Sequence, residues 1–250
     1  MYFPTTHWSL LAKATLSGET EAFAALNELC RRYWMPVNQF VHLRGYRGAE
    51  AEDITQEFFV HVCQHGMLQR ADRTRGRFRS FLLGALVRFL GDAQDRRNAF
   101  KRGGAQPHVS LDDASQSMAE AAEQLPAEEV VMFDRAWAQS ILSSVLSQMR
   151  DDFARMGRAK DFAILKQFLP GSSHSASYES ASQEMGVTVA ALTSDIHRLR
   201  GAFRERLRSE IAGTVSAPHE IDEEMAHLHR VLAHPETDFV DSTKDRPGNS

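Results

Sequence analysis

The stretch from Tyr178 to Leu207, YESASQEMGVTVAALTSDIHRLRGAFRERL, decides which fold the sequence predicts. A short helical pattern runs to Met185, and Gly186 then interrupts it. A second pattern follows with a step of three or four residues between apolar positions, which places one apolar stripe on a helix. Its members are Leu192, Ile196, Leu199, Phe203 and Leu207. Because two helices joined by a tight glycine turn are typical of a helix-turn-helix, the stretch predicts a unit that reads DNA.

The second helix of this unit would present its N-terminal residues to base edges. The small Ser182, four residues before Gly186, suits the close passage of one helix over the other. Asp195 is unusual on such a face because it repels phosphate. It can accept from a cytosine amino group or pair with Arg198, and the sequence leaves both open. The candidate contacts to duplex DNA are Thr188, Ala190, Thr193, Ser194, His197, Arg198 and Arg200.

The rest of the chain is also patterned as helix, which predicts an all-α fold. The chain has 250 residues, 42% of them hydrophobic, enough for one large or two small globular domains. No run alternates as a strand should. Helices are expected over about 20–43, 50–64, 78–97 and 159–169, with a further one starting near Phe133. Pro36 is expected to bend or interrupt the first of them.

Composition divides the chain into two helical domains joined by a flexible acidic linker. Gly103 and Gly104 end the first block, and the residues that follow are acidic and poor in large apolar side chains. The predicted boundaries are 1–104 for the first domain, 105–129 for the linker and 130–212 for the helix-turn-helix domain. Residues 213–250 form an acidic C-terminal extension with one short helix.

The net charge of −4 hides a strong separation of charge along the chain. Residues 70–102 hold ten basic and three acidic side chains, whereas residues 110–134 hold seven acids and no Lys or Arg. The extension is acidic again over 220–241, with seven acids against Arg230. Because local fields decide where a polyanion binds, we expect the extension or the linker to cover a basic surface in the free protein.

The helix expected over 50–64 carries Asp53, Gln56 and Glu57 at i, i+3 and i+4, on one face. Spacing alone favours an ordinary solvated face on an amphipathic helix. The alternative is an acidic docking face for a basic partner helix. Paired carboxylates can also serve catalysis, but no pocket or fixed neighbouring group accompanies them here, and no catalytic residue is assigned.

The helix expected over 78–97 combines arginines with aromatic residues, which suits unpaired nucleic acid. Arg77 and Arg79 flank Phe78 at its start, and Arg96 and Arg97 lie at its far end. Phe81 and Phe89 are expected to be core residues. Phe78 is the expected stacking residue because it lies where the loop meets the helix.

Other site types find little support. His61 and His65 stand at i, i+4 but lack a third ligand, so no metal site and no cofactor are expected. Cys30 and Cys63 are expected to be two buried, reduced thiols. The start of the chain has no secretory pattern, and no window is apolar for long enough to span a membrane, so a cytoplasmic protein is expected.

The chain resembles the extracytoplasmic-function class of bacterial RNA polymerase sigma factors over about residues 5–212. AEDITQEFFVHV, residues 51–62, looks like region 2.2 of that class. GRFRSFLLGALVRFLGDAQDRR, residues 76–97, is similar to regions 2.3 and 2.4. The helix-turn-helix looks like region 4. Both blocks occur in the order of the family with a variable linker between them, which is more specific than either block alone.

The resemblance implies a role for each block. Asp53, Gln56 and Glu57 would dock on the β′ coiled coil of core polymerase, and region 4 would read the −35 element and dock on the β flap. An anti-sigma factor is a further partner that the resemblance allows. The residues that would bind and open the −10 element are Arg77, Phe78, Arg79, Arg88, Asp92, Arg96 and Arg97.

Some positions depart from the family. Arg88 stands where Asn is common, and Thr193 and Asp195 stand where Lys and Arg are common. Tight binding of free DNA by region 4 is therefore not expected. The chemistry of transcription would belong to the polymerase, and this chain would not be an enzyme.

Two other functions remain open on the sequence. A stand-alone transcription regulator would bind duplex DNA without polymerase, but it would leave the Asp53 face unexplained. A helical interaction protein derived from a sigma factor would have lost promoter binding. We expect the arrangement of Arg77, Arg96 and Arg97, on one exposed face or not, to discriminate between promoter binding and its loss.

Overall fold

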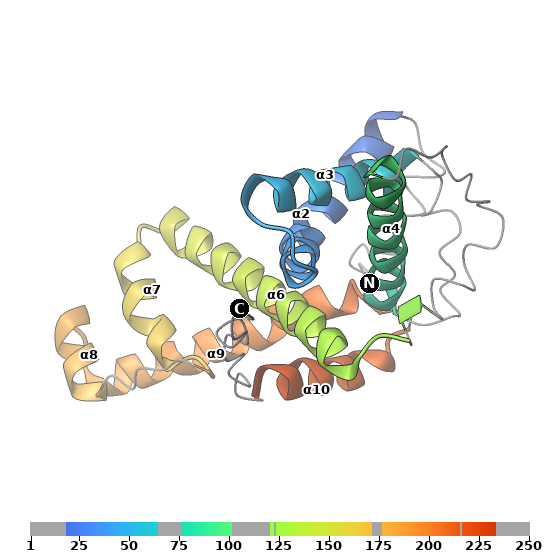
Figure 1. The fold of residues 1–250 in the computed structure, drawn as a ribbon. Helices are drawn as coiled ribbons and strands as arrows, with labels where there is room; N and C mark the ends of the chain where they lie inside the picture. Colours follow the sequence, from blue (N-terminus) through green and yellow to red (C-terminus); the bar gives the residue numbers. More distant parts are fainter. Residues whose placement is uncertain are drawn as a thin grey trace, which may run out of the picture.

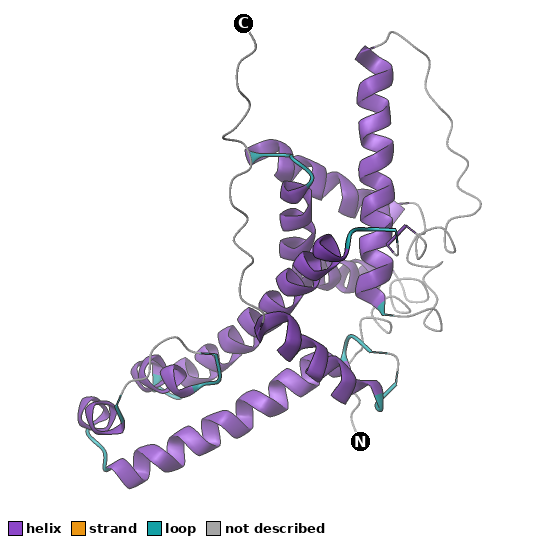
Figure 2. Ribbon diagram, turned by 60° about the horizontal axis from the view of Figure 1, so that its bottom comes forward, coloured by secondary structure: helices purple, strands orange, loops and turns teal. Residues whose placement is uncertain are grey.

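All regular structure is helical in the part of the chain that the computed structural model describes, residues 19–64, 77–101, 121–122, 124–171, 177–215 and 217–233. This confirms the all-α prediction, and Figure 2 draws the described residues as helices and loops. The elements are α2 (Glu19–Leu43), α3 (Gly48–Gln64), α4 (Phe78–Lys101), α6 (Ala127–Arg155), α7 (Ala159–Leu165), the 3₁₀ helix η3 (Lys166–Phe168), α8 (Tyr178–Met185), α9 (Val189–Ala212) and α10 (Glu220–Ala233).

Helices α2, α3 and α4 pack around a core rich in aromatic residues. The edge of Tyr33 on α2 meets the ring of Phe78 on α4, with 5.3 Å between ring centroids. Phe58 on α3 lies 5.6 Å from Phe89 on α4. Each of these residues falls on the apolar stripe of its own helix, so burying the three stripes together accounts for this bundle.

Of the two outcomes expected at Pro36, a bend or an interruption, the interruption does not occur, because α2 runs without a break from Glu19 to Leu43. Proline removes one backbone hydrogen bond from a helix interior. Here Pro36 is itself buried, and Tyr33, Val37 and Phe40 around it are at most 2% exposed. Packing of this apolar stripe outweighs the missing hydrogen bond.

The long helix α6 runs from the α2–α4 bundle to the helix-turn-helix (Figure 1). Its first half packs on α2, where Phe40 and Phe133 meet edge to face at 6.0 Å. Its second half packs on α7 and α9. The buried apolar residues of the two predicted domains therefore belong to one continuous core in the described chain.

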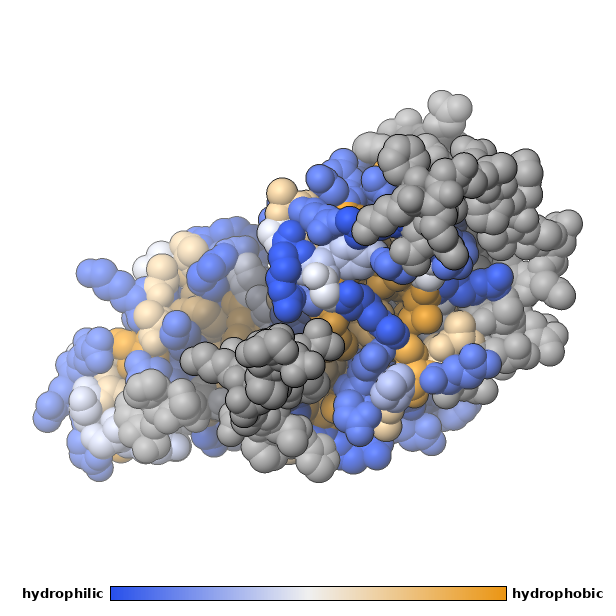
Figure 3. All heavy atoms as spheres, in the orientation of Figure 1, coloured by the Kyte–Doolittle hydropathy of each residue, from blue (hydrophilic) through white to orange (hydrophobic). Residues whose placement is uncertain are grey.

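Helix α10, from the acidic extension, packs on both α6 and α9. Leu228 and Val231 face the core, and Arg135 of α6 donates to the Val231 carbonyl at 3.2 Å. Figure 3 shows hydrophilic residues over most of the visible described surface, with hydrophobic residues between them. Among the described residues, no helix has the length and apolar character that crossing a membrane requires.

Candidate nucleic-acid interface

The predicted docking residues form an exposed face on α3. Asp53, Gln56 and Glu57 are all exposed, whereas the opposite side of α3 is buried. A polar contact fixes α3 on α2, because Asn38 donates to the Thr55 hydroxyl at 3.1 Å and that hydroxyl donates to the Ala51 carbonyl at 2.7 Å.

This face lines an open groove of about 480 Å³ between α3 and α4. Arg96 of α4 lies in the same groove, so the structure brings together the three predicted docking residues and one residue of the predicted −10 site. Val60, 45% exposed, extends the groove with an apolar surface. The groove thus offers carboxylates, an amide and an apolar contact to a partner, with one guanidinium opposite.

Phe78 is a core residue. The sequence predicted that it stacks on unpaired bases, and the structure corrects this because the ring is not accessible. Its side chain is fully buried against Tyr33. Phe81, which was expected to be core, is only partly buried, and Phe89 is buried as expected. Phe78 begins α4 and stands one helical turn before Leu82, which is also fully buried, so it belongs to the apolar stripe of the helix.

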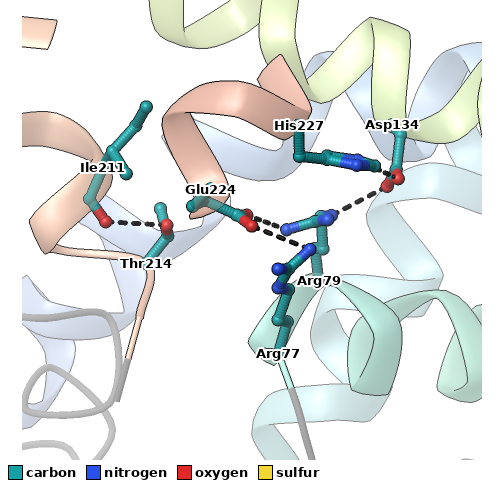
Figure 4. A network of polar contacts seen from close by, with 7 residues as sticks. All are labelled: Arg77, Arg79, Asp134, Ile211, Thr214, Glu224 and His227. Atoms are coloured by element: carbon teal, nitrogen blue, oxygen red, sulfur yellow. Dashed lines mark hydrogen bonds and ion pairs between the residues drawn. The ribbon is translucent and has the colours of Figure 1, made fainter. Parts of the chain in front are cut away.

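Arg79 is also buried, at 5% exposed, in a network that joins α4, α6 and α10 (Figure 4). Its guanidinium lies 4.5 Å from the ring centroid of Trp137. The Arg79 Nε donates to Asp134 Oδ1 at 2.8 Å, and the Nη1 donates to Glu224. The position of Arg79 is therefore that of a paired interior cation rather than an open phosphate contact.

Arg77 lies at the edge of the same network. Its Nη1 is 2.9 Å from Glu224 Oε2, and its side chain is 34% exposed while that of Glu224 is fully buried. His227 of α10 contacts Asp134 at 2.6 Å. Sequence reasoning placed Glu224 and Asp134 only in acidic runs. The position of Glu224 could have identified it as a buried residue. It falls on the apolar stripe of Ile221, Met225 and Leu228, where an acid requires a buried partner.

Two opposing effects set the ionisation of this network. Burial lowers the pKa of Arg79, and the carboxylate of Asp134 opposes that change. Burial of Asp134 disfavours its charged form, but the hydrogen bond from His227 and the charge of Arg79 outweigh burial and hold its pKa below the ordinary value. The network is thus held together as a set of ion pairs.

The basic residues of α4 do not form one surface. Arg96 and Arg97 are exposed near the end of the helix, whereas Arg77 precedes its start, about 28 Å away at 1.5 Å per residue. Arg97 pairs with Glu50 of α3 and lies over Tyr46. Arg88 and Asp92 lie between the two ends and are partly buried. One nitrogen of Arg88 is buried without a hydrogen-bond partner among the described residues.

The helix-turn-helix is formed as predicted. Gly186 ends α8 in the left-handed conformation, with φ of 66°, and Val187 N donates to the Ser182 carbonyl at 3.0 Å. Ser182 is buried, as a close passage of the helices requires. Thr188 caps α9 by accepting from Ala191 N at 3.2 Å. The predicted apolar stripe of α9 is buried throughout.

The N-terminal part of α9 presents a polar face to solvent. Ala190, Thr193, Ser194, His197 and Arg198 are exposed. The hydroxyls of Thr193 and Ser194 donate to carbonyls one turn back, at 2.8 and 3.1 Å, which leaves their oxygens able to accept. The face is available to a duplex, although it carries few positive charges.

Asp195 pairs with Arg198, so the ion pair that the sequence allowed is formed in the free chain. It also lies 3.2 Å from Arg158, a residue that the sequence reasoning missed. Arg158 precedes α7, and the two arginines line a hollow of about 580 Å³ between α6, α7 and α9. Arg200 donates from Nε to the Phe168 carbonyl at 2.9 Å and so anchors η3.

The expectation that both thiols are buried is wrong. Cys30 is partly buried and Cys63 is exposed, and their side chains are hydrogen-bonded to one another. Within the described residues, no group of three or more His, Cys, Asp or Glu side chains could hold a metal ion. His65 lies outside those residues, as do Arg70, Arg73 and Arg75 and most of the predicted linker.

Comparisons of the chain with protein-family models, with curated proteins and with solved structures found no match.

Proposed function

We propose that this chain is a bacterial RNA polymerase sigma factor of the extracytoplasmic-function class, acting in the cytoplasm. The observation that carries the proposal is the presence, in one chain, of a capped helix-turn-helix and of the exposed Asp53, Gln56 and Glu57 face. A stand-alone regulator needs the helix-turn-helix but not the docking face. A sigma factor needs both, because it must hold the enzyme and the promoter together.

In this proposal, the α3 face docks on the β′ coiled coil, and α9 reads the −35 element with support from the β flap. Arg96 and Arg97 neutralise phosphates of the −10 element at the end of α4. Opening DNA costs a few kcal/mol for each unstacked step, and contacts to the melted strands must offset that cost. Phe78 has no part in these contacts, because it is buried.

A second candidate, the sigma-derived interaction protein, is favoured by one observation. Arg77, Arg96 and Arg97 do not share an exposed face, and Arg79 is buried. Such a protein would bind polymerase through the docking face but would not open promoter DNA. Binding to polymerase without any promoter-dependent transcript would be its signature.

A binding titration of fluorescently labelled protein with purified bacterial core polymerase tests the docking step. We expect the triple variant Asp53→Ala, Gln56→Ala, Glu57→Ala to bind at least about tenfold more weakly than wild type, equal to about 1.4 kcal/mol. The matched control removes the same numbers of carboxylates and amides from exposed positions of α6 and α10, through Gln139→Ala, Asp151→Ala and Glu223→Ala. Equal affinities of the two variants would refute docking through α3.

A further inference from the structure

Helix α10 places a fully buried carboxylate, that of Glu224, between two arginines that precede or begin α4. A carboxylate held by two guanidiniums has the chemistry of a bound phosphate, because both are anions that accept several N–H bonds. Among the described residues, Asp134 is the one carboxylate that the guanidiniums of Arg77 and Arg79 would retain without α10. The site would then carry an unmatched positive charge at the start of α4.

We infer that Arg77 and Arg79 form an anion site for a nucleic-acid phosphate, and that Glu224 of α10 occupies this site in the free protein. The inference rests on the proposed function for the identity of the competing ligand, promoter DNA. Helix α10 is then an internal competitor, and the structure is the closed form of the protein.

In this inference, α10 is a docked element that can move away from α4. Two ion pairs of Glu224 join it to the start of α4, while its apolar stripe packs on α6 and α9. The chain leaves α9 through a tight turn in which Thr214 and Val215 are buried and the Thr214 hydroxyl donates to the Ile211 carbonyl at 2.8 Å. This short covalent connection gives Glu224 a high effective concentration at the arginines.

A nucleic acid competes effectively against such a carboxylate because it offers many phosphates and releases counterions when it binds. The approach is open on one side, since a third of the Arg77 side chain is exposed while Glu224 is fully buried. Arg77 therefore makes the first contact, and Arg79 becomes available when α10 moves. When α10 moves, α4 loses its contact with α10, which also packs on α9.

The test measures binding of a fluorescein-labelled, 20-nucleotide, mixed-sequence single strand to the full-length chain by anisotropy. Glu224→Gln removes one negative charge from the buried site. Its matched control, Asp222→Asn, removes one negative charge from the same helix, where Asp222 is exposed and paired with Arg208. Any general effect of net charge is therefore common to both variants.

We expect Glu224→Gln to bind the strand about five- to tenfold more tightly than wild type, and Asp222→Asn to stay within about twofold. Adding Arg77→Ala to Glu224→Gln should abolish this increase in affinity. The salt dependence of the Glu224→Gln variant should steepen by about 0.7 for each additional phosphate that the protein neutralises. Equal affinities of the two single variants would overturn the inference.

A second measurement on the wild-type chain keeps the test decisive if Glu224→Gln fails to fold. Hydrogen exchange across residues 220–233 is followed with and without the strand, at concentrations above the measured Kd. Because coupling is reciprocal, a ligand that competes with α10 must loosen it, so exchange should accelerate. Unchanged or slower exchange would overturn the inference. If the α3 variant weakens polymerase binding but the strand affinities of the two single variants are equal, α10 is no competitor and the sigma proposal still stands. If the strand affinities differ as expected but the α3 variant binds polymerase normally, α10 covers a DNA site in a protein that is not a sigma factor.

Discussion

Asp134 lies between Arg79 and His227, and its lowered pKa makes the free energy of unfolding depend on pH in the acidic range. Because this pKa is lower in the folded chain than in the unfolded chain, the stabilisation is fully present above the ordinary aspartate pKa of about 3.9. It is lost as the pH falls through the lowered, folded-state pKa.

We expect Asp134→Asn to reduce the free energy of unfolding at pH 7 by on the order of 3 kcal/mol, because Arg79 loses a buried partner. Urea unfolding of wild type and variant, compared between pH 7 and pH 2.5, provides the measurement. The difference between the two proteins should be constant at higher pH and shrink below about pH 4. A difference that stays the same down to pH 2.5 would contradict this account.

Of the two cysteines, Cys63 is the one that we expect to react faster with an alkylating agent. The hydrogen bond from Cys30 lowers the pKa of Cys63 to about 7, and burial opposes this only in part. The same contact, with burial, raises the pKa of Cys30. We expect alkylation by iodoacetamide to titrate with a midpoint near 7 in wild type, and nearer the ordinary thiol value of about 8.5 in Cys30→Ala. Cys63→Ser should remove the fast reaction, and a wild-type midpoint above 8 would count against the thiol contact.

The turn between α8 and α9 is the element whose conformation depends most on single residues. Gly186 has a φ of 66°, which an L-residue adopts at a cost of roughly 1–2 kcal/mol. Gly201 lies within α9, and a Cβ added there would meet no atom within 4 Å. The same substitution is therefore expected to act with opposite signs at the two sites.

Gly186→Ala should lower the free energy of unfolding by about 1–2 kcal/mol, whereas Gly201→Ala should raise it by up to about 1 kcal/mol. Thr188→Ala should lower it by about 1 kcal/mol, because α9 loses its N-cap. Urea unfolding monitored by circular dichroism measures all three. Equal effects of the two glycine substitutions would show that the turn does not require its left-handed residue.

Helices α8 and α9 could be predicted from the sequence, because residues close together in the chain determine where each helix begins and ends. The apolar spacing of α9, the glycine after α8 and the cap at Thr188 are all signals within a few residues. Pro36 misled the prediction, because the packing of its neighbours comes from other helices. Phe78 misled it for the same reason, since the surface that buries this ring lies on α2.

The arrangement of the whole molecule could not be predicted from local patterns. Ion pairs join residues that are far apart in sequence, such as Arg32 with Glu210 and Arg44 with Glu129. Each of these residues looks like an ordinary surface charge in the sequence. Their partners follow only from the packing of α6 on α2 and of α9 on α6, so the composition that suggested two domains gave no sign of the shared core.

The proposed function requires the chain to bind two separated stretches of DNA. The −10 and −35 elements are about 25 base pairs apart, or ~85 Å of duplex at 3.4 Å per base pair. We expect the α3–α4 surface and α9 to move apart when the protein binds both elements. Release of α10 and of the Arg32 and Arg44 ion pairs would be part of that opening.

Run-off transcription with purified bacterial core polymerase, on genomic fragments upstream of this gene, tests the sigma-factor proposal most directly. We predict specific transcripts with the wild-type chain and their loss with the Asp53, Gln56 and Glu57 triple variant, while the control variant at Gln139, Asp151 and Glu223 keeps them. Absence of any specific transcript, together with duplex binding that needs no polymerase, would contradict the proposal and identify a stand-alone regulator.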